Sequence, residues 1–191
     1  YKRALRIDPR NSMALYNLGL ARCASGDMAS ARGDLATLEL LDAAAAAKLR
    51  RQMETAELLA RTDVLTGLAN RRAFDEAAQL EIQRAQRYAT PLALVMTDLD
   101  YFKAINDKYG HHVGDLVLRN FARILSESVR NVDLVGRWGG EEFAILMPDT
   151  DLEEAVRAAE RMRVAVADAP PVEGLDGGLA SAAFVDQHQA M

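Results

Sequence analysis

Two adjacent carboxylates, Glu141 and Glu142, follow the glycine pair Gly139–Gly140 in the stretch RWGGEEFAILM, and another acid, Asp98, closely follows the apolar run LALVM. Like charges about 4 Å apart in an effective dielectric of about 20 repel by ~4 kcal/mol, so carboxylates that meet need protonation, hydration or a bound cation. Mg²⁺ and Mn²⁺ prefer oxygen ligands, and Mg²⁺ is usually held by one or two carboxylates plus substrate phosphates. If these acids meet, the sequence indicates a divalent-cation site, with the glycines leaving room for a bulky ligand. Taken alone, each stretch is more often a solvated turn or a polar strand end than part of a cation site.

The elements around these acids predict an α+β domain. The apolar run 92–96 predicts a buried strand, and residues 134–138 and 141–147 predict two strands joined by a two-residue hairpin turn at the glycines. The order strand–helix–strand–strand–helix is that of a split βαβ, ferredoxin-like sandwich, in which the first and third strands are antiparallel neighbours. Asp98 would then lie beside Glu141 and Glu142. Helices are predicted over 74–88, 102–108, 114–129 (with Asp115 as a candidate N-cap) and 150–167, and Ala69–Asn70 is predicted as a turn or helix cap.

Residues 1–62 are predicted to be helical almost throughout, with breaks near Asp8–Asn11 and Ser25–Asp27. Over residues 1–43, small and apolar residues fall at offsets that resemble a partial tetratricopeptide repeat, and the alternative is a plain helical hairpin. One repeat cannot bury its own apolar face, so we expect further repeats before residue 1. One alanine-rich helix is predicted from Leu40 to Thr62, with 44–62 as a linker. Its residues Leu49, Met53, Ala56 and Ala60 recur with the spacing of a coiled-coil seam. The helix would then be either a dimerising signalling helix or a solvated spacer.

Composition limits the class of protein. The chain has 191 residues, 27% of them charged, with a net charge of −5, which argues against a protein that coats nucleic acid. No apolar run approaches the roughly 20 residues of a membrane span, so we expect none. The single cysteine, Cys23, excludes an internal disulfide and favours a cytoplasmic location.

Three stretches of the sequence together resemble the GGDEF family of diguanylate cyclases. They are TDVLTGLANRRAF (62–74), ALVMTDLDYFKAINDKYGHHVGDLVL (93–118) and RNVDLVGRWGGEEFAILMPDT (130–150). The resemblance assigns residues 63–191 to this domain, which is a nucleotidyl-cyclase-type sandwich. It implies an enzyme that condenses two GTP molecules into cyclic di-GMP and releases pyrophosphate. Each domain would hold one GTP, and two domains would meet face to face as a homodimer.

The resemblance also implies roles for individual residues. Asp98, the Leu99 carbonyl, Glu141 and Glu142 would hold Mg²⁺ or Mn²⁺, and Glu141, Glu142 and Lys103 would be catalytic. The amides of Phe102 and Lys103, with the Lys103 ammonium, would cradle the phosphates at a helix start. The remaining substrate-binding positions would be Asn106 and Asp115 on the guanine edge, Leu65 and Leu118 against the base, and Gly139 and Gly140 at the turn.

A second pattern, Arg130-Asn131-Val132-Asp133, matches the family's RxxD inhibitory site, where an arginine fork can bind a phosphate and face a guanine of cyclic di-GMP. An alternative function is therefore a catalytically impaired receptor for cyclic di-GMP or GTP that acts through Arg130 and Asp133. A third is a scaffold that uses only the repeat-like helices to bind a protein partner.

The match fades after Ala169. The family adds a strand similar to SIGVA and then a helix whose Lys and Arg reach the triphosphate. Here Leu179 to Val185 would be a degenerate fourth strand, and we expect the closing helix to be absent. One sheet edge and one apolar face would then be uncovered.

Overall fold

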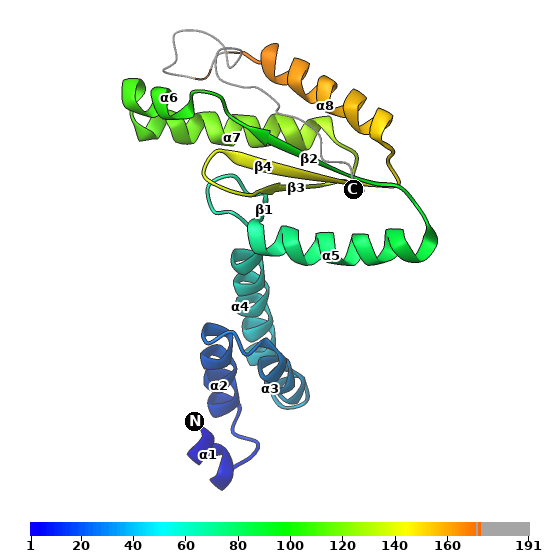
Figure 1. The fold of residues 1–191 in the computed structure, drawn as a ribbon. Coiled ribbons are helices and arrows are strands. Elements are labelled where there is room, and N and C mark those ends of the chain that lie inside the picture. The colour runs from blue at the N-terminus through cyan, green and yellow to red at the C-terminus, as the bar shows by residue number, and fades with distance from the viewer. Residues whose placement is uncertain (171, 173–191) are drawn as a thin grey trace. The chain divides into compact units, whose positions relative to one another are not determined.

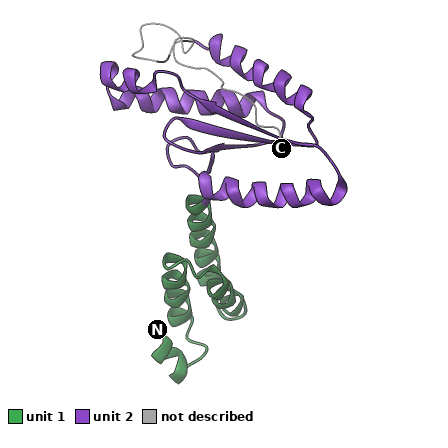
Figure 2. Cartoon of the chain, viewed as in Figure 1, with its two compact units in different colours: residues 1–60 green, residues 61–191 purple. Residues whose placement is uncertain are grey.

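The computed structural model describes residues 1–170 and 172. The chain divides into two compact units, Tyr1–Ala60 and Arg61–Met191 (Figure 2). Among the described residues, no helix combines the length and apolar character that a bilayer-crossing segment requires.

The first unit is helical, and short polar caps set where its helices begin. Asn11 accepts a hydrogen bond from the Ala14 amide at 2.9 Å, and Asp27 accepts one from the Ser30 amide at 3.2 Å. Gly19 allows close packing, because a Cβ there would lie 2.6 Å from Leu49 Cδ2. The helices are α1 (Lys2–Ile7), α2 (Ser12–Ala24), α3 (Met28–Leu41) and α4 (Ala43–Arg61).

The helix predicted to start at Leu40 is broken, because α3 continues to Leu41 and Asp42 begins a new helix. The Asp42 carboxylate accepts hydrogen bonds from the Ala44 and Ala45 amides at 3.1 and 3.0 Å. Leu49 and Met53, half of the predicted seam, are buried in one core with Leu15, Ala31, Leu38 and Ala46. This part of α4 packs within the helical unit and is not available to a partner helix.

The second unit contains a four-stranded sheet in the order β1-β3-β4-β2 (Figure 1). Strand β4 pairs antiparallel with both β2 and β3, so the predicted first and third strands are neighbours, as expected. The segment Ala69–Asn70, predicted only as a turn or cap, also forms a short strand parallel to β3. Asn70 does cap the next helix, since its side chain accepts from the Ala73 amide at 2.9 Å. The strands are β1 (Ala69–Asn70), β2 (Leu92–Asp98), β3 (Leu134–Arg137) and β4 (Glu142–Pro148).

Helices cover both faces of this sheet, which confirms the α+β prediction. Helix α5 (Arg71–Tyr88) lies on one face, and α6 (Phe102–Tyr109), α7 (His111–Ser128) and α8 (Leu152–Ala167) lie on the other (Figure 1). Alternation along β4 sends Phe143, Ile145 and Met147 into the core under α6–α8, whereas Ala144 and Leu146 face α5.

Helix α7 begins at His111, earlier than predicted, after Gly110 with φ of +85°. Asp115 is therefore an interior helical residue and not its N-cap. Helix α8 begins after Asp151, which forms a capping box with Glu154. The predicted fourth strand, Leu179 to Val185, lies outside the described residues.

Candidate active site

The register of β2 and β4 places Asp98 directly opposite Glu142. Opposite residues of an antiparallel pair point to the same face of the sheet, so these two carboxylates are neighbours. The Leu99 amide donates a hydrogen bond to the Glu141 carbonyl at 3.3 Å, which links the end of β2 to the hairpin. The structure therefore brings together acids more than 40 residues apart, as the split βαβ arrangement predicted.

The acidic groups are not neutralised by their surroundings. Burial raises the pKa of Asp98, and the nearby Glu142 and Asp100 carboxylates raise it further. Burial also raises the pKa of Glu141, with added repulsion from Asp98 and Glu142. No cationic side chain contributes to either pKa shift, so the cluster lacks a positive counter-charge from the described residues.

The hairpin between β3 and β4 holds the Glu142 side chain against its glycines. The Trp138 and Gly139 amides both donate to the Glu142 carbonyl, at 2.8 and 3.2 Å. The turn is therefore three residues, Gly139–Glu141, and not the predicted two. A Cβ on Gly139 would lie 2.2 Å from Glu142 Oε2, whereas one on Gly140 would meet nothing within 4 Å. Only Gly139 is required by the position of the carboxylate.

Arg137 fixes the position of this hairpin. Its Nε and Nη2 donate to the Gly140 carbonyl at 3.2 and 2.6 Å, and its Nη1 donates to Asp63 Oδ1 and Oδ2 at 3.1 and 3.3 Å. Burial alone would raise the pKa of Asp63, but hydrogen bonds from Thr66 and Arg137 outweigh burial and hold that pKa below its usual value. The pairing of Arg137 with Asp63 could not be predicted from the sequence, because nothing in their spacing shows that the segment containing Asp63 lies beside β3.

The loop after β2 leads into α6, where phosphate contacts were predicted. Tyr101 adopts φ of +58°, and the Phe102 amide donates to the Leu99 carbonyl at 3.2 Å. The Phe102 amide thus has a hydrogen-bond partner within the turn, and its predicted contact with the phosphates stays a prediction. Lys103, at the start of α6, is exposed and can reach an anion in solvent.

The residues predicted to read a guanine lie where α6 meets α7. A Cβ on Gly114 would lie 2.0 Å from Asn106 Oδ1, so the Asn106 side chain rests against Gly114 of α7, the residue before Asp115 in the sequence. Leu118 is only 2% exposed and belongs to the core, against which the half-buried Leu65 packs. Asn106 and Asp115 thus lie on the two packed helices α6 and α7, whereas Leu118 is almost fully buried; their roles in guanine binding stay predictions.

The donor set fits Mg²⁺, although the residues do not form a preassembled metal cage. Within residues 1–170 and 172, no group of three or more His, Cys, Asp or Glu side chains is arranged to hold a metal ion. Two carboxylates in register, Asp98 and Glu142, with the adjacent Leu99 carbonyl, are nevertheless the ligands that Mg²⁺ takes before substrate phosphates complete its shell. Asp98 and Glu142 also line a small cavity of about 90 Å³.

The RxxD segment is already engaged in the fold. The Arg130 guanidinium contacts Asp133, and its Nη2 also donates to the Pro148 carbonyl at 3.1 Å and Thr150 Oγ1 at 2.6 Å. The Arg130 side chain is 51% exposed and that of Asp133 is 0% exposed. Arg130 can therefore meet a ligand on its outer side, whereas Asp133 can act only by holding Arg130.

Comparison with known proteins identifies the second unit. Residues 60–173 match the sequence profile described as "Diguanylate cyclase, GGDEF domain". The chain belongs to the GGDEF family. Residues 1–33 match a tetratricopeptide repeat profile, which confirms the resemblance of the first helices to that repeat.

Similar proteins include a response regulator and a diguanylate cyclase. The response regulator PleD of Caulobacter vibrioides is 46% identical over 122 residues, covering 64% of this chain and 27% of PleD. Diguanylate cyclase DgcM of Escherichia coli is 45% identical over 118 residues, covering 62% of this chain and 29% of DgcM. The chain thus spans between a quarter and a third of the length of these two relatives.

Solved GGDEF structures share the fold. The coiled coil and GGDEF domain of DgcB from Caulobacter crescentus, in complex with cyclic di-GMP, superposes with a TM-score of 0.69 at 31% identity, covering 76% of this chain and 77% of that one. The active GGEEF domain of a diguanylate cyclase from Vibrio cholerae has a TM-score of 0.52 at 38% identity, covering 54% and 66%. Its signature has the same Glu-Glu pair that this chain carries at Glu141 and Glu142.

Proposed function

We propose that this chain is the catalytic part of a diguanylate cyclase that condenses two GTP molecules into cyclic di-GMP with release of pyrophosphate. The observation that carries the proposal is the pairing of Asp98 with Glu142 at the ends of two neighbouring strands. Carboxylates that repel one another and lack a cationic partner favour a divalent cation, which in turn favours a triphosphate. Family membership and the Glu-Glu signature support the same reaction.

Each group has a defined task in this proposal. Asp98, Glu142 and the Leu99 carbonyl would hold Mg²⁺, which when bound neutralises charge on the phosphates. Glu141 would share in this acidic site, and Lys103 would face the triphosphate. Asn106 and Asp115 would form hydrogen bonds with the edge of the guanine base. A purine that lacks the hydrogen-bonding groups of that edge would leave both side chains unpaired. Exposed Gly140 leaves backbone space above the turn for the nucleotide.

The reaction needs two domains that each present one GTP, so the active form would be a homodimer. Incubation with GTP and Mg²⁺, followed by chromatographic separation of the nucleotides, tests the proposal. Glu142→Gln should lower cyclic di-GMP production by about 100-fold or more, the order seen when one transition-state stabiliser is removed. The control Glu153→Gln removes a charge from an exposed acid on α8 and should leave production unchanged.

The alternative function predicts a different result in the same assay. Cyclic di-GMP binding without turnover by the parent chain would indicate a receptor that acts through Arg130. If the enzyme is active, the same site would serve product feedback, with the buried Asp133 holding the arginine in place. Arg130→Ala should then abolish inhibition by added cyclic di-GMP.

Two further assignments complete the proposal. The repeat-like helices of the first unit would bind a protein partner that regulates the cyclase, and the reaction would take place in the cytoplasm. The crystal structure of the diguanylate cyclase SiaD with its activator SiaC, from Pseudomonas aeruginosa, offers a parallel for a protein regulator, at 33% identity and a TM-score of 0.56.

A further inference from the structure

Three side chains form a row across the sheet at the candidate active site. The register of β2 and β4 pairs Asp98 with Glu142, and on the other side of β4 the Trp138 amide donates to the Glu142 carbonyl at 2.8 Å. Opposite residues of antiparallel strands share a face of the sheet, so all three side chains lie on the face that α5 covers. Trp138 is one strand spacing, about 5 Å, from Glu142 and two spacings, about 10 Å, from Asp98. An aromatic side chain thus stands next to the acidic pair, Asp98 and Glu142.

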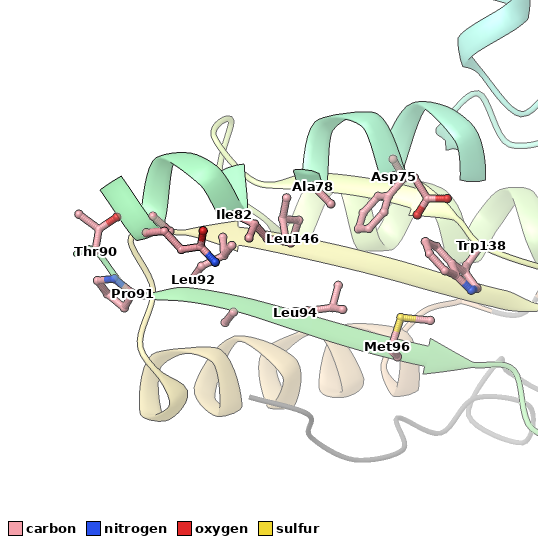
Figure 3. Close-up of a pocket in the computed structure, with 14 residues that line it drawn as sticks. Asp75, Ala78, Ile82, Thr90, Pro91, Leu92, Leu94, Met96, Trp138 and Leu146 are labelled. Atoms are coloured by element: carbon pink, nitrogen blue, oxygen red, sulfur yellow. The ribbon is translucent and has the colours of Figure 1, made fainter. Parts of the chain in front are cut away.

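The Trp138 ring contacts two residues at the start of α5. The Phe74 ring meets it edge-on, with ring centroids 5.8 Å apart and an interplanar angle of 86°. The Arg71 guanidinium lies over the Trp138 ring, with its carbon 4.6 Å from the ring centroid. Figure 3 shows the indole between the N-terminal part of α5 and Met96 of β2. The cation–π contact fixes the position of the guanidinium on the same face of the sheet as the acidic pair.

Arg71 carries a charge that no carboxylate compensates within the part of the chain that the structure describes. Its neighbour Arg72 differs, because Arg72 Nε donates to Glu76 Oε1 at 3.0 Å. Asp75 lies one turn along α5, at the spacing that favours an ion pair, yet Arg71 stacks on Trp138 instead. Contact with a ring does not use the N–H donors of a guanidinium in hydrogen bonds to oxygen, so Arg71 keeps its donors for an anion.

The ring also holds this cation away from the metal ligands. An arginine beside a carboxylate forms a strong, often bidentate ion pair. Such a pair with Glu142 would occupy the oxygens that Mg²⁺ needs. Stacked on Trp138, Arg71 is close to the acidic pair without blocking it.

We propose that Arg71 binds the phosphate groups of the nucleotide, with the Trp138 ring as the platform that positions its guanidinium. The inference rests on the proposed nucleotide site, since Mg²⁺ held by the acidic pair would bring a triphosphate to this face of the sheet. Guanidinium N–H groups bind phosphate oxygens in parallel pairs, so this ligand suits an arginine. Arg71 would add a second cation to Lys103, which lies at the start of α6 on the other face of the sheet (Figure 1).

Calorimetry with a GTP analogue tests the contact without turnover. In the analogue, a methylene group replaces the oxygen between the α and β phosphorus atoms, so this bridge cannot be cleaved. Arg71→Gln should lower the affinity for the analogue with Mg²⁺ by about tenfold or more, the order expected when a hydrogen bond to a charged group is lost. Arg71→Lys keeps the charge and should recover part of the affinity. The matched control Arg72→Gln removes the adjacent charge and should bind as the parent.

Trp138 gives a second readout, because it is the only tryptophan of the chain. Binding of the analogue should change the Trp138 emission in the parent and in Arg72→Gln, and by much less in Arg71→Gln. If the stacking were merely structural, Arg71→Gln would alter the emission of the free protein and leave the affinity unchanged.

Equal affinities of Arg71→Gln and Arg72→Gln would overturn the proposal, and so would a parent chain that does not bind the analogue. A parent that binds the analogue through Arg71 but forms no cyclic di-GMP from GTP would contradict the cyclase reaction alone. The two proposals can therefore fail separately.

Discussion

Removal of the Arg137 side chain should destabilise the second unit and release the hairpin that carries the acidic pair. Arg137→Ala deletes two hydrogen bonds to Asp63 and two to the Gly140 carbonyl. The side chains of Arg137 and Asp63 are 15% and 24% exposed, between the surface and fully buried cases. Exposed pairs contribute about 0–1 kcal/mol, and breaking buried ones costs about 3–5 kcal/mol. Asp63 keeps its hydrogen bonds from Thr66, so we expect a loss of about 2–3 kcal/mol in the free energy of unfolding.

Urea denaturation followed by Trp138 fluorescence measures this loss within the second unit. The control Arg157→Ala removes an arginine whose ion pair with Glu153 is exposed, and it should change stability by less than about 0.5 kcal/mol. A double-mutant cycle of Arg137→Ala with Asp63→Asn should give a coupling of about 1–2 kcal/mol. A loss no larger than that of the control would refute the proposed tether, as would a coupling near zero.

Three further outcomes follow from the same geometry. The pKa of Asp63 is lower in the folded state than in the unfolded state, so its carboxylate adds stability above about pH 4. This stability is lost as the pH falls through the folded-state pKa. The difference in stability between the parent and Asp63→Asn, measured by urea denaturation, should therefore shrink in that window. Asp98→Asn relieves repulsion across the strands and should raise stability by about 0.5 kcal/mol in low salt without metal, while the thermal shift caused by Mg²⁺ disappears; an unchanged Mg²⁺ shift would contradict the proposed site. Gly139→Ala forces the Glu142 carboxylate to move and should weaken Mg²⁺ binding measured by calorimetry, whereas Gly140→Ala, with open space around it, should leave folding stability unchanged.

Local sequence was enough to predict most elements of the second unit. The apolar run before Asp98 predicted β2, and the glycines before Glu141 predicted a hairpin, because strand and turn propensities act over a few residues. Errors fell where a local signal had two interpretations. Asp115 had the chemistry of an N-cap, but Gly110 already separates α6 from α7 through its positive φ.

The sequence by itself determined which chemistry is available: oxygen ligands at predicted strand ends, a glycine pair directly before two glutamates, and no cysteine pair. Only the tertiary structure decided which groups meet. Arg137 reaches Asp63 across 74 residues because β1 pairs with β3, and the first half of the α4 seam is buried because α2 and α3 occupy it. Such contacts depend on the free energy of packing the whole unit, which no short stretch of sequence encodes.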